Sequence, residues 1–275
     1  MSAKRGGGSA PSIPERLSRS QTQLNRLARQ LNVAVPPNGF EFAVLGIGQR
    51  SRTLFRAIGH LVDKRDAEIA IPTLLRPLVE MNVLLRFLAV DPELHTELWY
   101  VEGERNVVTL VNEFSSSHGL AGRWARLLSV NIDPAAFASR REAVERVRDK
   151  ARAAGVAGVA KTGAVLPSIT HQQRATGDLA ATEAYTMAYR PLSWDVHGGA
   201  RMLLNGRIDP QQDGRVTYSD AMDDRRSALA VRALAVSTFA STLVLCGANL
   251  GLSELEATAA EILADWVPQS SSMLP

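Results

Sequence analysis

Residues 71–90 read IPTLLRPLVEMNVLLRFLAV, and this stretch decides the class of fold. Its core-forming residues recur at the i, i+3, i+4, i+7 spacing of one helix face: Ile71, Leu74, Leu75, Leu78, Asn82 and Leu85. Pro72 and Pro77 should start or kink the helix, because proline cannot donate a helical hydrogen bond. The stretch is apolar nearly all round, so we expect a buried helix over residues 66–90.

Helical spacing and helix-start residues recur on both sides of this stretch. Periodicity predicts helices over residues 14–32 and 42–64. Asp91-Pro92 and Asp133-Pro134 each place a capping residue before a first-turn proline, which predicts a helix start. Ser253 to Glu256 matches a capping box and predicts the start of the last helix.

Signals for β-strands are scarce, since no two alternating runs are joined by a hairpin turn. Aromatic residues make up only 5% of the 275 residues, which favours closely packed helices over a sandwich. We therefore expect an all-α, multi-helix bundle with a single core and no substantial sheet. One helical domain over residues 13–268 would lie between a disordered, basic Gly/Ser tail (1–12) and a flexible C-terminal tail (269–275).

Charge and cysteine content limit the classes of partner and cofactor. The net charge is only +3, yet Glu15 is the single acid among the first thirty residues, which hold six basic residues. This basic arm either solvates the chain or contacts an acidic partner, RNA or a membrane. Cys246 is the only cysteine, so neither an internal disulfide nor a cysteine zinc site can form, in keeping with a cytoplasmic protein.

Two further features test for a membrane span and for cofactors. Residues 233–252 carry no charge and are long enough to cross a bilayer, but several Ser, Thr and Gly residues lower their hydropathy. We expect a buried central helix there and no membrane span, with a membrane-anchored protein as a minor alternative. The five histidines form no close pair, and Ala160 replaces the glycine that a phosphate-binding loop needs before Lys161. No metal and no cofactor is predicted.

Arg76 and Glu80 lie four residues apart within the apolar helix and therefore share one face. A buried charge must be paired, so one reading is an internal salt bridge that fixes the register of the helix. The other reading is that the pair supports a polar pocket for a functional motif elsewhere in the chain.

That motif is YRPLSWDVHG, residues 189–198. Proline favours the first helical position, so Pro191 predicts a helix start. Arg190 and His197 then lie about two turns apart on one face, about 10 Å along the axis. Ser193 precedes His197 by four residues and shares that face. No orienting acid can be assigned, because Asp195 lies on a different face, and a serine hydrolase is a remote reading.

Arg-x6-His at the start of a late helix resembles the signature of the HEPN superfamily of helical domains. The combination of Arg76 and Glu80 with the later Tyr-Arg-x-Leu-Ser-x-x-x-His-Gly run also resembles an uncharacterised bacterial all-helical family. In HEPN ribonucleases the Arg and His act on RNA without metal, usually across a dimer. The resemblance implies that Arg190 stabilises phosphate charge and that His197 is a general acid or base. Tyr189, Ser193, Arg76 and Glu80 would be binding residues.

Two hypotheses follow from these observations. The first is a HEPN-like protein that acts on or binds RNA, as a metal-independent ribonuclease in a toxin or defence setting. Pro191 and the low aromatic content depart from what active HEPN nucleases show. The second is a non-catalytic helical interaction or scaffold protein, in which Arg190, Ser193 and His197 form a structural polar cluster. RNA, a protein partner and a second copy of the chain are the partners that these hypotheses imply.

Overall fold

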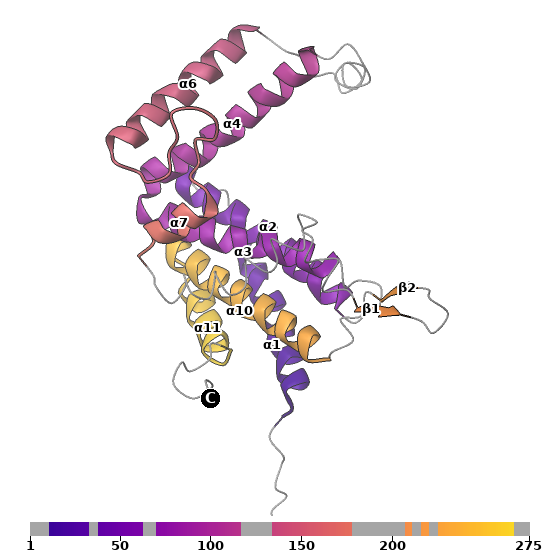
Figure 1. Cartoon of the computed structure of the whole chain (residues 1–275). Coiled ribbons are helices and arrows are strands. Elements are labelled where there is room, and N and C mark those ends of the chain that lie inside the picture. Colours follow the sequence, from indigo (N-terminus) through magenta and orange to yellow (C-terminus); the bar gives the residue numbers. More distant parts are fainter. Residues whose placement is uncertain are drawn as a thin grey trace, which may run out of the picture. The chain divides into compact units, whose positions relative to one another are not determined.

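The computed structural model describes residues 11–32, 38–62, 70–116, 134–177, 207–210, 216–219 and 225–266 (Figure 1). In chain order the elements are α1 (Ile13–Leu27), the short 3-10 helix η1 (Ala28–Leu31), α2 (Gly39–Leu61), α3 (Ala70–Val90), α4 (Pro92–Ser116), α6 (Pro134–Ala153), α7 (Ile169–Ala175), β1 (Arg207–Pro210), β2 (Val216–Ser219), α10 (Arg225–Leu250) and α11 (Ser253–Ala264). The protein is all-α, as predicted. Helix α7 had no sequence signal that we recognised.

The two short strands are the exception to the helical pattern. Strands β1 and β2 pair antiparallel, with Ile208 opposite Tyr218. This pair was not recognised in the sequence, but two strands of four residues each are no substantial sheet, as predicted. Val216 and Tyr218 favour strands, and Asp213-Gly214, a pair common in hairpin turns, lies between the two strands in the sequence. A two-stranded ribbon leaves the all-α class unchanged.

Local hydrogen bonding confirms one predicted helix cap and contradicts another. Asp91 Oδ1 accepts from the Leu94 amide at 3.1 Å, which confirms the predicted start of α4. The predicted capping box at Ser253 is wrong, because Leu252 holds the cap position and makes no side-chain hydrogen bond. Gly251, in a left-handed conformation with φ of 67°, turns the chain just before it.

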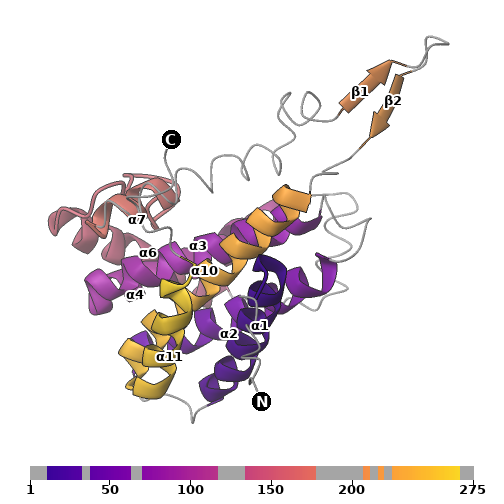
Figure 2. The same cartoon turned by 90° about the horizontal axis from the view of Figure 1, so that it is seen from below.

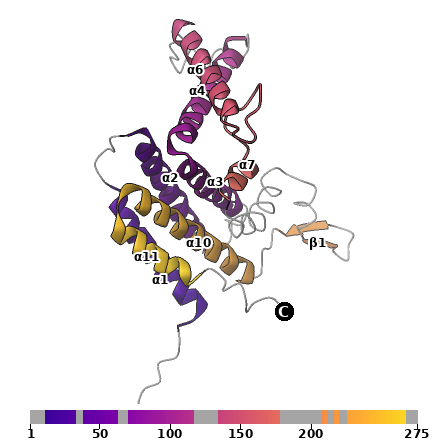
Figure 3. The ribbon, with the colours of Figure 1, turned by 90° about the vertical axis from the view of Figure 1, so that its left-hand side faces the viewer.

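The described residues fall into two compact units, and the division lies within α3. One unit comprises residues 1–85 and 183–275, and the other comprises residues 86–182. In the first unit, α10 packs against α1, α2 and α11 (Figures 2 and 3). Phe55 of α2 stacks on Phe239 of α10 with ring centroids 4.4 Å apart. Helix α10 is thus the central helix that the sequence predicts at residues 233–252.

Val231–Leu250 of α10 is long and apolar enough to cross a membrane by composition. Half of this segment is buried within the protein, as in the core helix of many globular folds. Leu243 and Cys246 are fully buried, and Gly247 lies against the backbone of α11, where a Cβ would come within 2.7 Å of the Glu256 amide nitrogen. Contacts to neighbouring helices therefore account for much of its apolar surface.

The second unit is built on α4 and α6, which run antiparallel beside each other (Figure 1). Lys150 near the end of α6 pairs with Glu97 near the start of α4 at 2.8 Å. Arg140, nearer the start of α6, pairs with Glu104 of α4 at 2.9 Å. Residues 154–168 form an irregular connector, with glycines of positive φ at 155, 158 and 163.

Candidate functional site

Tyr189, Arg190, Ser193 and His197, the residues of the predicted motif, lie outside the described residues. Their roles stay predictions. The other two predicted site residues, Arg76 and Glu80, belong to α3 and are described in full.

Arg76 and Glu80 form the ion pair that their spacing predicts. Arg76 Nε lies 2.9 Å from Glu80 Oε1, and the side chains are 18% and 30% exposed. The expectation of a fully buried pair is wrong, because α3 is not covered all round: Thr73 is exposed, and Pro77 and Met81 are half-buried. Ion pairs of this spacing and partial exposure contribute about 0.3–0.5 kcal/mol, so the pair orients its groups more than it stabilises the fold.

A buried polar cluster lies further along α3, within the same unit. Asn82 Nδ2 donates to Ser241 Oγ and to Thr242 Oγ1, each at 3.1 Å, and joins α3 to α10. Thr242 Oγ1 in turn donates to the Thr238 carbonyl at 2.9 Å. Buried polar groups are costly unless they are hydrogen-bonded, so this cluster fixes the register between the two helices. The sequence showed Asn82 only as a polar residue among apolar ones.

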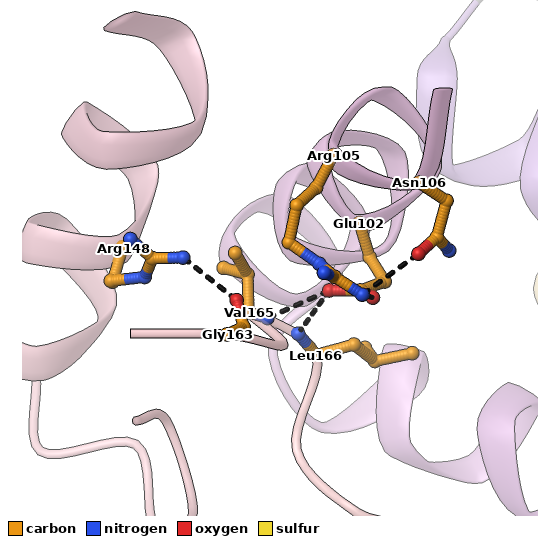
Figure 4. A network of polar contacts seen from close by, with 7 residues as sticks. All are labelled: Glu102, Arg105, Asn106, Arg148, Gly163, Val165 and Leu166. Carbon is orange, nitrogen blue, oxygen red and sulfur yellow. Dashed lines mark hydrogen bonds and ion pairs between the residues drawn. The ribbon is translucent and has the colours of Figure 1, made fainter. Parts of the chain in front are cut away.

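A second polar network lies in the unit formed by residues 86–182 (Figure 4). Glu102 of α4 accepts hydrogen bonds from the backbone amides of Val165 and Leu166, at 2.7 and 3.2 Å. Its other carboxylate oxygen accepts from Arg105 Nη2 at 2.6 Å and from Arg105 Nε at 3.0 Å. The carboxylate therefore binds the connector to α4.

Arg148 of α6 binds the same connector from the other side. Its side chain is 6% exposed and donates to the Gly163 carbonyl at 2.9 Å (Figure 4). The same side chain pairs with Glu145. Gly163 has a φ of 80°, a left-handed conformation that favours glycine. Residues 163–166 are thus bound by side chains from both helices. The network was not predicted, because its partners are up to 64 residues apart in the sequence.

The protonation of this network favours a structural role. Partial burial tends to raise the pKa of Glu102, but the hydrogen bonds from Arg105, Val165 and Leu166 outweigh it and hold the pKa below its usual range. The same contact raises the pKa of Arg105. Glu102 is therefore ionised at neutral pH and has its oxygens engaged, so it is poorly suited to general acid–base catalysis.

Metal and thiol chemistry find little support in the described part of the chain. No group of three or more His, Cys, Asp or Glu side chains there could hold a metal ion. Cys246 is fully buried in α10, and burial raises the pKa of its thiol to about 12. A buried thiol with that pKa carries almost no thiolate at neutral pH, so Cys246 is poorly suited to act as a nucleophile.

The comparisons with other proteins give a family and no function. No curated protein and no solved structure matches the chain. A sequence profile matches residues 41–215, more than half of the 275 residues. The matched span includes Arg76, Glu80 and the motif from Tyr189 to His197, while α1, α10 and α11 lie outside it. The chain therefore belongs to DUF5677, a family of unknown function.

Proposed function

We propose that the protein is a HEPN-like, RNA-directed helical protein that cleaves RNA without a metal ion. The observation that carries the proposal is the spacing of Arg190 and His197 in the family-matched part of an all-α chain. The proposal assigns the chemistry to two side chains that need no cofactor.

In this proposal the two residues divide the chemistry of phosphodiester cleavage. Arg190, permanently charged, stabilises the negative charge that develops on the scissile phosphate. His197 transfers the proton to or from the reacting oxygen, a role for which histidine is the commonest side chain in enzymes. A composite site formed by two copies of the chain would make activity depend on protein concentration.

The test is incubation of the purified protein with RNA in EDTA. Wild-type protein should cleave, and Arg190→Ala and His197→Ala should each lose at least about a hundredfold in rate, the usual effect of removing such a group. Arg141→Ala and His60→Ala are matched controls, because both side chains are exposed in the described structure. No cleavage by wild type, or equal loss in the controls, refutes the proposal.

A non-catalytic interaction or scaffold protein is the second candidate. It is supported by the ion pair between Arg76 and Glu80, since these predicted binding residues contact each other within one helix, as a structural polar cluster requires. In this case Arg190→Ala and His197→Ala should lower the melting temperature, and wild type should leave RNA intact. An affinity pulldown should then recover a stoichiometric protein partner, and its absence would count against the scaffold.

A further inference from the structure

Helices α1 and α2 of the first unit run antiparallel and meet along a polar seam. At one end Gln49 Nε2 donates to the Leu31 carbonyl at 3.0 Å. At the other end Gly59 lies against the Gln21 side chain, where a Cβ would come within 1.8 Å of Nε2. These two contacts fix which face of each helix borders the other.

Helical spacing then identifies the side chains along this border. On α2, Arg52 and Arg56 follow Gln49 by three and seven residues and so share its face. On α1, Asn25 follows Gln21 by four residues and shares its face, and Arg29 lies in η1 two residues before Leu31, whose carbonyl accepts from Gln49. We call the α1–α2 seam the set Gln21, Asn25, Arg29, Gln49, Arg52 and Arg56.

The seam carries positive charge that no carboxylate neutralises. Described residues 11–62 contain seven arginines but only two acids, Glu15 and Glu41. Among the described residues, Arg29, Arg52 and Arg56 take part in no ion pair. In the other unit, by contrast, Arg105 and Arg140 are each paired with a glutamate.

Two polar atoms inside the seam also lack partners. Arg52 Nε and Asn25 Oδ1 are both buried and have no hydrogen-bond partner in the described structure. Most buried polar atoms in folded proteins are hydrogen-bonded, so each such exception needs an explanation. The exposed guanidinium groups of Arg29 and Arg56 supply accessible donors suited to phosphate oxygens, and half-buried Arg52 adds positive charge on the same helix as Arg56.

We infer that the α1–α2 seam binds the phosphate backbone of RNA. The inference rests on the proposed function, which supplies RNA as the ligand. Arg52 and Arg56 lie about 6 Å apart along the helix axis, which suits several phosphates of one strand better than a single ion. The seam contributes charge and polar groups without base-reading aromatic residues, so the binding should be independent of sequence.

Salt-dependent binding in a His197→Ala background, where RNA stays intact under the proposed mechanism, tests the inference. The probe is a labelled, unstructured single-stranded RNA, and its affinity is measured by fluorescence anisotropy from about 50 to about 200 mM salt. The seam variant is Arg29→Gln with Arg56→Gln, because both side chains are exposed and their loss should not unfold the chain. The control variant, Arg19→Gln with Arg50→Gln, removes the same charge from exposed positions.

Arg19 and Arg50 each lie two residues before a seam residue and thus about 200° round the helix from it. The seam variant should flatten the slope of log affinity against log salt by about 1.4, as expected for two lost phosphate contacts on a single strand. Arg29→Lys with Arg56→Lys should restore most of that slope. Equal slopes in the seam and control variants, or no RNA binding, overturn the inference.

A parallel measurement uses phosphatidylserine vesicles as a different anionic surface. Vesicle binding through Arg29 and Arg56 without RNA binding overturns the inference in favour of a membrane. The outcome is separable from that of the proposed function. Seam-dependent RNA binding with no cleavage by the wild type refutes the ribonuclease and supports the seam. Cleavage by the wild type, together with RNA binding that the seam variants do not change, supports the ribonuclease and refutes the seam.

Discussion

Glu102→Ala should destabilise the unit formed by residues 86–182. The substitution removes the acceptor of two backbone amides, those of Val165 and Leu166. An orphaned buried donor costs about 1–3 kcal/mol. The Glu102 side chain is 14% exposed, so some water can replace it, and we expect the lower part of the summed range, about 2–3 kcal/mol. Arg105 keeps its hydrogen bond to Asn106 at 2.8 Å and adds little to this cost.

Two measurements check this expectation. Urea unfolding followed by circular dichroism gives the change in the free energy of unfolding, with Glu142→Ala as the control because Glu142 is exposed on α6. Hydrogen exchange of the Val165 and Leu166 amides gives the local effect, and about 1.4 kcal/mol of lost protection corresponds to tenfold faster exchange. A loss below about 0.5 kcal/mol with unchanged exchange at both amides would refute the reasoning.

The pH dependence of this effect has a definite sign. The folded-state pKa of Glu102 lies below its ordinary value, so the carboxylate stabilises the fold above the unfolded pKa. That contribution is lost as the pH falls through the lowered folded pKa. The difference in stability between wild type and Glu102→Ala should therefore narrow below about pH 4.3. A difference that grows in acid would show that the carboxylate is not held as an anion.

Two further substitutions, each with a control, and one labelling experiment probe other contacts. Gly247→Ala should destabilise the fold by about 1–3 kcal/mol, because its Cβ would lie 2.7 Å from the Glu256 amide nitrogen. Gly46→Ala, whose Cβ would meet nothing within 4 Å, should stabilise the fold by about 0.5–1 kcal/mol. Thermal unfolding of both variants measures the two effects. His95→Ala should lower the free energy of unfolding by about 2–3 kcal/mol, since the ring stacks on Phe87 at 3.8 Å and Nδ1 lies 2.6 Å from the Phe87 carbonyl oxygen. The control His60→Ala, at an exposed position, should change it by less than about 0.5 kcal/mol, as measured by urea unfolding. Cys246 should react with a thiol-specific disulfide reagent only as fast as the protein unfolds, and rapid labelling of native protein would contradict its burial.

The parts of the fold that could be predicted from the sequence depend on local chemistry. Asp91 caps α4 as its position before Pro92 suggests, and Arg76 reaches Glu80 because both lie on one helix turn. Ser253 failed as a cap because the turn at Gly251 placed the helix start one residue earlier than the motif implied. The deciding residue, Gly251, was again close in the sequence, but its left-handed conformation could not be predicted from the residues beside it.

Contacts between segments that are far apart in the sequence could not be predicted from it. Nothing in the sequence pairs Asn82 with Ser241 and Thr242, which lie 159 and 160 residues further on. The exposure of Arg76 and Glu80 depends in the same way on which neighbouring helices cover α3. The α1–α2 seam could be predicted in part: the excess of arginine was visible, but the border between the helices was not.

The packing of α10 determines whether the family-matched segment can fold without the rest of the chain. Phe55 and Gly48 lie within the matched span, and the ring and the thiol that cover them, Phe239 and Cys246, lie beyond its end. A fragment trimmed to residues 41–215 would expose an aromatic and aliphatic surface on α2 to water and should aggregate. The unit that folds is larger than the stretch by which members of the family are recognised. Expression or engineering of this protein must therefore include the helices that lie outside the family match.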